Sequence, residues 1–589
     1  MLYDHIAEAY EAMEATTKRL EMLDHLVSLL KETPPAFLDK LVYLTQGKLY
    51  PDFMGVEIGI ADKMAARAIA LATGADEGVV NDSYRDSGDL GLSAEALFNA
   101  SGHPPRPSLT VESVYRTLDS IAQTAGVGSV DAKLGLFAEL MKVATPREAK
   151  YLVRTVTGKL RLGVADMTII DGLAAVFGRG KEDKTAVERA YNICSDLGQV
   201  ASTLAAEGVE GIAGFKVRVG NPIRPMLAER LPSATDILEK IGGECAAEYK
   251  YDGERVQVHK RGEEVMLFSR RLENITEQYP DVAELVLARF RAREVIAEAE
   301  TVAVDLETGD LRPFQELMHR RRKHGIQEAI LEYPIAMFFF DCLYRDGEDL
   351  TTLPYPERRR ILEEVVDVDE RARLAIRKVT TDPDELERFF EQAIADGCEG
   401  LICKTTSPEG VYRAGGRGWQ WIKYKRDYKS EMTDTVDLVA VGALHGRGRR
   451  AGSYGALLLA TYDPATDMFR TITKCGAGFT DANLAEFGER FKGLVIDHRH
   501  PRVEAKMIAD VWFVPSVVME VLGAEVTLSP IHPSGMDRVR AGAGLAIRFP
   551  RFTGNFREDK APEDATTEDE VVEMYESRLH GVRAAKGES

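Results

Sequence analysis

Long apolar runs are missing from this 589-residue sequence. No segment approaches the roughly 20 consecutive apolar residues that a membrane-spanning helix needs. The segment Met1 to His5 does not begin the basic and then apolar layout of a signal peptide. Internal repeats of fixed period and stretches of low complexity are also absent. These absences argue against a membrane protein, a secreted protein or a repeat array, and they predict a cytoplasmic globular protein.

Cysteine is scarce and scattered. The chain has six cysteines, and no two of them form the CxxC pair typical of structural zinc sites. Several lie inside apolar runs, as reduced core residues do. The pattern therefore excludes a four-cysteine zinc site and predicts free thiols. The six are Cys194, Cys245, Cys342, Cys398, Cys403 and Cys475.

Positive charge is in deficit. The chain has 75 Lys and Arg but 95 Asp and Glu, which gives a net charge of −20. This balance argues against a protein that coats nucleic acid indiscriminately, but it allows local binding where cations gather. They gather at His319 to His324, at Arg447 to Arg450 and at Lys423 to Lys429. Taken singly, each cluster could equally be a solvated face.

The length exceeds what one core can fill, so several domains are expected. Helical patterns dominate residues 1–215, and glycine and proline between Gly211 and Pro232 indicate a connection. Strands and helices then mix over residues 216–430, as in an α+β domain. Short strands separated by glycine turns follow over 431–589 and are typical of a small barrel, and the last twenty residues predict a charged helix.

The segment Glu248 to Arg255 is the most informative in the chain. Strand alternation places Glu248, Lys250 and Asp252 on one face. The following Asp-Gly pair predicts a two-residue hairpin that would set Lys250 opposite Arg255. Crowding by a second cation in a dry pocket favours the neutral amine that a nucleophile needs. The alternative is an exposed hairpin with a solvated Lys–Glu pair.

Two later segments could complete a site with Lys250. A strand at Val295 to Glu300 aligns Glu298 with Glu300, and a buried carboxylate there needs a metal, a cation or ligand hydroxyls. In the next segment, Phe338 and Phe340 share a strand face. Such a stripe is usually core, but a flat ring can also stack on a purine.

Cations and an acid follow further along the chain. Glu399 precedes Gly400 at the start of a strand, and Lys423 and Lys425 share one face of another. Two neighbouring ammonium groups repel each other unless a polyanion such as phosphate lies between them. Arg417, in a glycine-rich approach, could add a bidentate phosphate contact.

Together these segments resemble motifs I, III, IIIa, IV and V of the covalent nucleotidyltransferases, which include ATP-dependent DNA ligases, RNA ligases and messenger-RNA capping enzymes. Segments around Arg548 to Arg551 and Arg557 to Lys560 resemble motif VI. Longer runs at Arg312 to Met318, Lys423 to Tyr428 and Pro562 to Thr567 are similar to archaeal replicative DNA ligases, over nearly the whole chain. The resemblance implies a helical DNA-binding domain at 1–215, an adenylation domain at 216–430 and an OB-fold domain at 431–589.

The resemblance also implies a role for each matching residue. Lys250 would take AMP onto its side chain, with Glu248 beside the adenine and Phe340 stacked on it. The other implied contacts are Arg255 and Glu300 near the ribose, Arg270 near a phosphate or the DNA end, Arg417, Lys423 and Lys425 on phosphates, Lys560 on the leaving pyrophosphate, and Glu399 with Glu300 on magnesium. Ala299 departs from the glycine common between the two acids of motif III, which makes Glu300 less secure than Lys250.

The activity implied is the sealing of nicks in double-stranded DNA, with ATP and Mg²⁺, by a monomer whose domains encircle the duplex. The segment Pro383 to Phe390 partly matches the clamp-docking box of archaeal ligases but lacks its glutamine. We interpret it as an amphipathic helix, with docking on a sliding clamp as the alternative. A capping enzyme that uses GTP and a non-catalytic DNA clamp or scaffold are the competing functions. An NAD-dependent ligase is disfavoured because the four-cysteine zinc site is missing.

Overall fold

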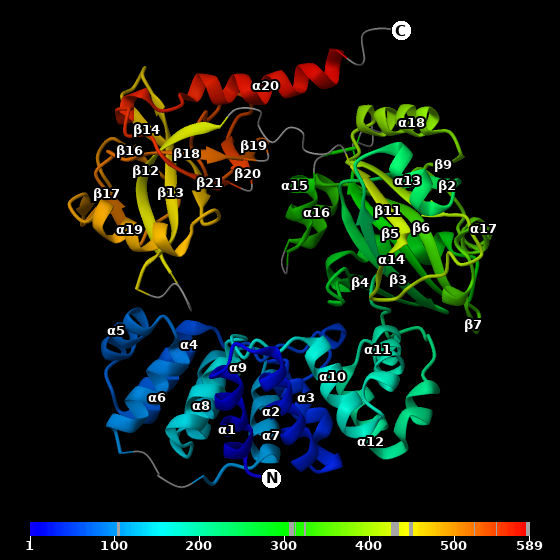
Figure 1. Ribbon diagram of the computed structural model, residues 1–589, viewed down its shortest axis with the longest axis horizontal. Coiled ribbons are helices and arrows are strands. Elements are labelled where there is room, and N and C mark those ends of the chain that lie inside the picture. The colour runs from blue at the N-terminus through cyan, green and yellow to red at the C-terminus, as the bar shows by residue number, and fades with distance from the viewer. Residues whose placement is uncertain are drawn as a thin grey trace. The chain divides into compact units, whose positions relative to one another are not determined.

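The computed structural model describes residues 1–102, 107–304, 311, 312, 314–322, 325–425, 435–446, 452–523, 525–548 and 550–584. The chain forms two compact units, one of Met1–Asn81 with Leu90–Lys425 and one of Asp82–Asp89 with Arg426–Ser589 (Figure 1). Across the described ranges, every helix is too short or too polar to cross a bilayer. All six cysteines are free and buried, as predicted.

The N-terminal third is helical, coloured blue to cyan in Figure 1. Apolar faces on its helices pack together, for example Val114, Leu118 and Ile121 of α7. Thr110 begins that helix with a capping box, accepting a hydrogen bond from the Ser113 amide. The helices are α1 Tyr3–Glu14, α2 Arg19–Glu32, α3 Leu38–Thr45, α4 Asp62–Thr73, α5 Glu77–Ser87, α6 Leu90–Ala100, α7 Val111–Gln123, α8 Ser129–Lys142, α9 Pro146–Val156, α10 Asp166–Phe177, α11 Lys181–Cys194 and α12 Leu197–Ala213.

The α+β part of the first unit contains two sheets. One has the strand order β1-β11-β10-β2-β9, and the other has the order β4-β3-β5-β6-β7 with β8 paired to β6. The strands are β1 Leu227–Arg230, β2 Cys245–Lys250, β3 Glu254–Arg261, β4 Glu264–Ser269, β5 Glu294–Ala303, β6 Ile335–Arg345, β7 Glu348–Asp349, β8 Ala372–Leu374, β9 Arg377–Thr380, β10 Gly400–Thr405 and β11 Arg417–Lys425.

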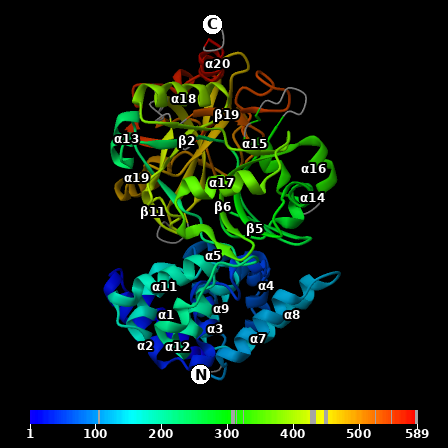
Figure 2. The same ribbon diagram turned by 90° about the vertical axis from the view of Figure 1, so that its right-hand side faces the viewer.

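Helices cover the outer faces of both sheets. α17 packs on β6, across the front of Figure 2, and α18 packs on β2, β9 and β10. Alternation along each strand therefore sends apolar side chains outward to these helices and polar ones to the inner faces. The helices are α13 Ala234–Ile241, α14 Pro280–Arg289, α15 Phe314–Leu317, α16 Ile326–Glu332, α17 Tyr355–Val365 and α18 Pro383–Ala395.

The second unit is rich in strands and its main sheet is curled. Strand β12 makes this possible, because its first half pairs with β18 and its second half with β17. The elements are β12 Val436–His445, β13 Tyr454–Asp463, β14 Met468–Cys475, α19 Asp481–Phe491, β15 Val495–Ile496, β16 Val503–Glu504, β17 Val511–Phe513, β18 Val518–Leu522, β19 Glu525–Ser529, β20 Gly544–Arg548, β21 Arg551–Phe556 and α20 Glu568–Ala584. The predicted fold class, an all-α part followed by α+β and barrel-like parts, is confirmed.

Candidate active site

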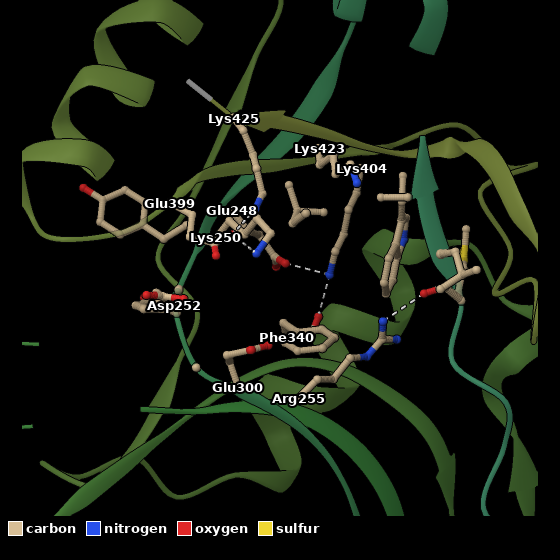
Figure 3. Close-up of a pocket in the computed structure, with 18 of the residues that line it drawn as sticks. Glu248, Lys250, Asp252, Arg255, Glu300, Phe340, Glu399, Lys404, Lys423 and Lys425 are labelled. Atoms are coloured by element: carbon tan, nitrogen blue, oxygen red, sulfur yellow. Dashed lines mark hydrogen bonds and ion pairs between the residues drawn. The ribbon is translucent and has the colours of Figure 1, made fainter. Parts of the chain in front are cut away.

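A cavity of about 400 Å³ lies between the inner faces of the two sheets. Figure 3 draws 18 of its lining residues and labels ten of them, which come from both sheets. With one exception, every residue singled out from the sequence as a site residue lines this cavity. These are Glu248, Lys250, Arg255, Arg270, Glu300, Phe340, Glu399, Arg417, Lys423 and Lys425, and the exception is Lys560.

Lys250 ends β2 and makes an ion pair with Glu399. Gly400 stands opposite Lys250 on one side and Lys425 on the other, so Glu399 lies beside both lysines. Lys425 Nζ is 2.5 Å from the same Glu399 oxygen. Burial alone would raise the pKa of Glu399, but the two ammonium groups outweigh it and hold that pKa at about 2. The acid is therefore ionised at neutral pH.

The predicted hairpin between Lys250 and Arg255 is wrong. β2 pairs with β9 and β10, whereas β3 pairs with β4 and β5, so the turn between them passes from one sheet to the other. Gly253 is needed there because a Cβ atom would lie 2.3 Å from the Thr301 carbonyl oxygen of β5. The second cation beside Lys250 is therefore Lys425, and Arg255 faces the pocket from the other sheet.

Arg255 is held by a buried carboxylate and by the backbone. Its guanidinium is 2.8 Å from a Glu298 oxygen and donates to the Met226 carbonyl at 2.8 Å. Tyr412 donates to Glu298 at 3.0 Å and so completes the cluster. Glu298 and Glu300 share the inner face of β5, as the alternation predicted, but Glu298 holds Arg255 rather than lining the cavity.

Phe340 forms one wall of the cavity. Its neighbour Phe339 points the opposite way, into the core beneath α14 and α17. Phe338 shares the face of Phe340, as predicted, but it is buried and stacks on Tyr251 with ring centroids 3.9 Å apart. The core interpretation thus holds for Phe338, while Phe340 offers a ring to the cavity, with the Arg255 guanidinium 5.4 Å from its centroid.

Glu248 and Lys404 form a buried ion pair at the cavity wall, where the two side chains meet above Phe340 (Figure 3). Lys404 Nζ lies 2.6 Å from Glu248 and donates to the Phe340 carbonyl at 2.9 Å. Burial lowers the pKa of Lys404, against the pull of Glu248. Lys404 is not among the residues predicted for the site, although it lies on the strand that begins at Gly400, and alternation places it on the inner face with Ile402.

Two acids on the cavity wall have raised pKa values. Burial raises the pKa of Glu300 to about 7, against Lys250 and Arg255, which lower it. Burial and then repulsion from Glu399 raise the pKa of Asp252 to about 6. Asp252 was recognised as part of the lysine motif but not as a site residue, and it lines the cavity.

Cations line the rim of the cavity. Burial and repulsion by Lys425 and Arg417 lower the pKa of Lys423. Arg417 begins β11 and is exposed, as is Arg270 in the turn after β4. The side chains predicted to contact phosphate are thus gathered on one surface, where an anion would relieve their repulsion.

Lys560 belongs to the second unit, where its Nζ lies 2.7 Å from Asp437. Arg557 shares that carboxylate oxygen at 2.7 Å. Arg548 and Arg551 also lie in this unit, on β20 and β21. Phe549, between them, lies outside the described residues.

The basic cluster at 319–324 is partly structural. Arg320 is buried against Asp281 at 2.5 Å, and Arg321 lies 2.5 Å from Glu254. Both arginines are therefore paired with acids, and for the buried Arg320 such a partner is required. Residues 323, 324 and 447–450, and those from 426 to 429, lie outside the described residues.

The segment Pro383 to Phe390 lies in helix α18, so its interpretation as an amphipathic helix is confirmed. Leu386 and Phe390 are buried in the core beneath that helix. Phe390 stacks on Tyr424 with centroids 4.4 Å apart. Two side chains of the partial clamp-docking match are thus committed to the core behind β11.

Comparison with known proteins gives matches along the chain. Residues 2–174, 225–425 and 450–560 match the families described as "DNA ligase N terminus", "ATP dependent DNA ligase domain" and "ATP dependent DNA ligase C terminal region". The chain is 53% identical over 586 residues to "DNA ligase 2" of Thermofilum pendens, covering 98% of this chain and 97% of that protein. It is 50% identical over 575 residues to "Probable DNA ligase" of Aquifex aeolicus, covering 98% of each. The solved structure "Pmar-Lig_PreS3" is similar in fold, with a TM-score of 0.53, 18% identity, and coverage of 94% of this chain and 99% of that one.

Proposed function

Because the chain belongs to the ATP-dependent DNA ligase family, an enzyme family that uses ATP to seal nicked DNA, we propose that Lys250 is the nucleophile that carries AMP. The observation that supports this role is the position of Lys250. It ends β2 at the wall of a cavity that also contains an aromatic ring, a buried acid and a rim of cations. That combination matches the base, ribose and phosphates of one nucleotide.

The base would stack on Phe340, because a flat purine gains most from a flat aromatic wall. Glu248 and Lys404 would then face its edge as an acceptor and a donor, in a buried setting where each hydrogen bond counts strongly. Arg255 and Glu300, opposite each other on β3 and β5, would flank the ribose.

The phosphates would lie along the cation rim. Lys423, Lys425 and Arg417 all project from β11 into the cavity, so they can neutralise the charge that moves from the α-phosphate to the leaving pyrophosphate. Lys560, from the second unit, is proposed to assist that departure. Phosphoryl transfer gains mainly from such positioning and charge.

The acids of the cavity fit a Mg²⁺ site that phosphate oxygens of the nucleotide would complete. The described residues contain no cluster of three metal-ligating side chains. Mg²⁺ does not require one, since it is often bound by one or two carboxylates together with phosphate oxygens and water. Glu300 and Glu399 line the same cavity and can supply those carboxylates. When bound, the ion would neutralise phosphate charge.

Three transfers follow from this arrangement. Lys250, once it has lost a proton, forms a bond from Nζ to the α-phosphorus of ATP as the bond to pyrophosphate breaks. The 5′-phosphate of the nick then attacks that phosphorus and releases Lys250, which regains a proton. Finally the 3′-hydroxyl attacks the activated 5′-phosphorus and AMP leaves. Glu399, ion-paired to Lys250, holds the amine in place for the first step.

DNA binding is assigned to the domains predicted from the sequence, 1–215, 216–430 and 431–589. The helical domain 1–215 would hold phosphates and groove shape, because a joining enzyme must act at any sequence. We propose a monomer acting on one nicked duplex. Docking on a sliding clamp is not assigned to α18, since Leu386 and Phe390 are buried.

Labelled ATP tests the assignment. Incubation with ATP and Mg²⁺ should leave one AMP on the protein, and Lys250→Ala should abolish it. Lys240→Ala, an exposed lysine on α13, is the matched control and should keep the label. Label retained in Lys250→Ala refutes the role. Replacing ATP with GTP tests the capping-enzyme alternative, and sealed product from a nicked duplex excludes a non-catalytic clamp.

A further inference from the structure

Protein side chains occupy most of the hydrogen-bond acceptor positions of the Glu248 carboxylate. One oxygen accepts from the Tyr355 hydroxyl and from Arg359, whose NH1 is 3.0 Å away. The other oxygen accepts from Lys404 at 2.6 Å. A carboxylate offers about four acceptor positions in all. One position, on the oxygen that Lys404 contacts, is therefore left for a ligand.

Two of these three partners lie behind Glu248, away from the cavity. Glu248 and Lys404 line the cavity, whereas Tyr355 and Arg359 do not. Both come from α17, and they are buried to 1% and 4% exposure. Tyr355 and Arg359 thus touch the ligand-facing acid without being able to touch the ligand.

Arg359 is itself fixed at three points. Besides Glu248, it donates to the Ala375 carbonyl at 3.1 Å and to Glu363 at 2.9 Å. A planar guanidinium held in this way has little freedom, so the Glu248 oxygen that it contacts has little freedom either. The direction of the last acceptor position on Glu248 is therefore set from α17, more than 100 residues away in the sequence.

We propose that Arg359 and Tyr355 are positioning residues that determine base specificity, by aiming the one remaining acceptor of Glu248 at an N–H of the nucleobase. The inference rests on the proposed placement of the base between Phe340 and Glu248. An adenine presents its 6-amino group to such an acceptor. A guanine presents a carbonyl oxygen at that position, and two buried acceptors facing each other lose a hydrogen bond that water would have supplied.

Arg359 also keeps the charge of the site in balance. Glu248 is 1% exposed, and a carboxylate that deep needs cationic partners. Without Arg359, Lys404 would be its sole cationic partner among the contacts described, and the carboxylate could turn toward it. The acceptor would then no longer point at the 6-amino group, although ATP could still stack on Phe340.

The experiment compares ATP with purine riboside triphosphate, which lacks only the 6-amino group. In the wild-type protein, removal of a hydrogen bond to a charged acceptor should lower kcat/KM for self-adenylation by about 10- to 100-fold. In Arg359→Met the same removal of the 6-amino group should lower kcat/KM by less than about threefold, because the Glu248 acceptor no longer points at that group. We call this loss of kcat/KM the penalty. With ATP itself, the variant should raise KM and leave kcat near its wild-type value.

Arg360→Met is the matched control. Arg360 is the next residue of the same helix, but its side chain is 63% exposed and pairs with Glu364. The full penalty should therefore persist in this variant. Tyr355→Phe removes one hydroxyl and keeps the ring, so it gives the same test if Arg359→Met does not fold, and its penalty should also shrink.

A merely structural role would slow both nucleotides equally. A full penalty in Arg359→Met and Tyr355→Phe would therefore overturn the inference. The proposed function fails separately. If the wild-type protein shows no penalty, the base does not lie against Glu248, and if it takes no AMP onto Lys250, the nucleophile is wrong.

Discussion

The Cα of Gly253 passes so close to β5 that a Cβ atom on it would lie 2.3 Å from the carbonyl oxygen of Thr301. Gly400 has the same relation to Tyr424, whose carbonyl oxygen would be 2.3 Å from an added Cβ, and its φ of +140° is one that other residues rarely adopt. One glycine follows Lys250 by three residues and the other follows Glu399 directly. The close approach of backbone at both points lets the lysine and the acid meet at the cavity.

We predict that Gly253→Ala disrupts the site. The Thr301 carbonyl belongs to a central strand and cannot move away cheaply, so the added methyl should cost about 1–3 kcal/mol of stability. The turn that carries Lys250 would shift, and the rate of self-adenylation should fall at least about 100-fold, as small misplacements of reacting groups do. Thermal unfolding and AMP labelling measure the two effects.

Gly135→Ala is the control for that substitution. Gly135 lies inside α8 with nothing within 4 Å of an added Cβ, and an alanine there should stabilise the helix by up to about 1 kcal/mol. Normal AMP labelling by Gly253→Ala would show that the turn tolerates a side chain.

Alternation made much of the site predictable. Glu248 and Lys250 share the inner face of β2, and Phe340 and Phe338 share a face of β6, because period-two alternation is a local property of any strand. The hairpin was mispredicted for a related reason. An Asp-Gly pair indicates a turn. The pairing of the strands on either side of the turn depends on contacts that are distant in sequence, and here β3 pairs with β5.

The residues that support the site from behind have no such local pattern. Arg359 lies 111 residues after Glu248, on a helix whose sequence gives no sign of the contact. Arg320 was read as part of a basic surface cluster, yet its side chain is 0% exposed and pairs with Asp281. Composition cannot distinguish a buried arginine from a solvated one, because the difference lies in a partner brought by the fold.

We predict that the demand for Mg²⁺ falls as pH rises. Glu300 has a pKa of about 7, raised mainly by burial, so below that pH it carries a proton that a metal must displace. The Mg²⁺ concentration for half-maximal self-adenylation should drop by up to about tenfold per pH unit below pH 7 and level off above it. Asp252, with a pKa of about 6, adds to the dependence at the acid end.

Glu300→Gln separates this effect from the titration of ATP itself. The variant has no proton to lose, so it should need more Mg²⁺ at pH 8 and show a flatter dependence between pH 6 and 8. Glu264→Gln, at an exposed position on β4, should behave as the wild type does. Identical pH dependence in wild type and Glu300→Gln would remove Glu300 from the metal site.

We predict that Lys560→Ala slows the first transfer most. A cation on the leaving pyrophosphate matters only while pyrophosphate is leaving, so self-adenylation should fall by about 10-fold or more. Sealing of a nick that already carries AMP should change little. Single-turnover assays of the two steps give the comparison.

Lys492→Ala is the control within the same unit, since Lys492 is 74% exposed and pairs only with Glu489 among the described contacts. Both steps should proceed normally in that variant. Equal losses in the two steps of Lys560→Ala would show that Lys560 acts through stability or DNA binding, because neither of those is confined to the pyrophosphate step.

The salt dependence of nick binding tests how the enzyme holds DNA. The net charge of −20 opposes general attraction to DNA, so we expect binding to come from local cations that displace counterions from the phosphates. The logarithm of the binding constant should therefore fall linearly with the logarithm of salt concentration. Arg270, exposed at the rim of the cavity, is proposed to contact a phosphate or the DNA end.

Arg270→Ala identifies the partner of that side chain. If Arg270 binds a phosphate, the variant should weaken nick binding and make the salt slope shallower by about one. Arg261→Ala, at the far end of β3 and paired with Glu264, should leave the slope unchanged. If Arg270→Ala binds nicked DNA with the wild-type slope yet slows sealing, the guanidinium acts on the transferring group. If the binding constant of the wild type hardly changes with salt concentration, contacts to phosphates do not dominate DNA binding.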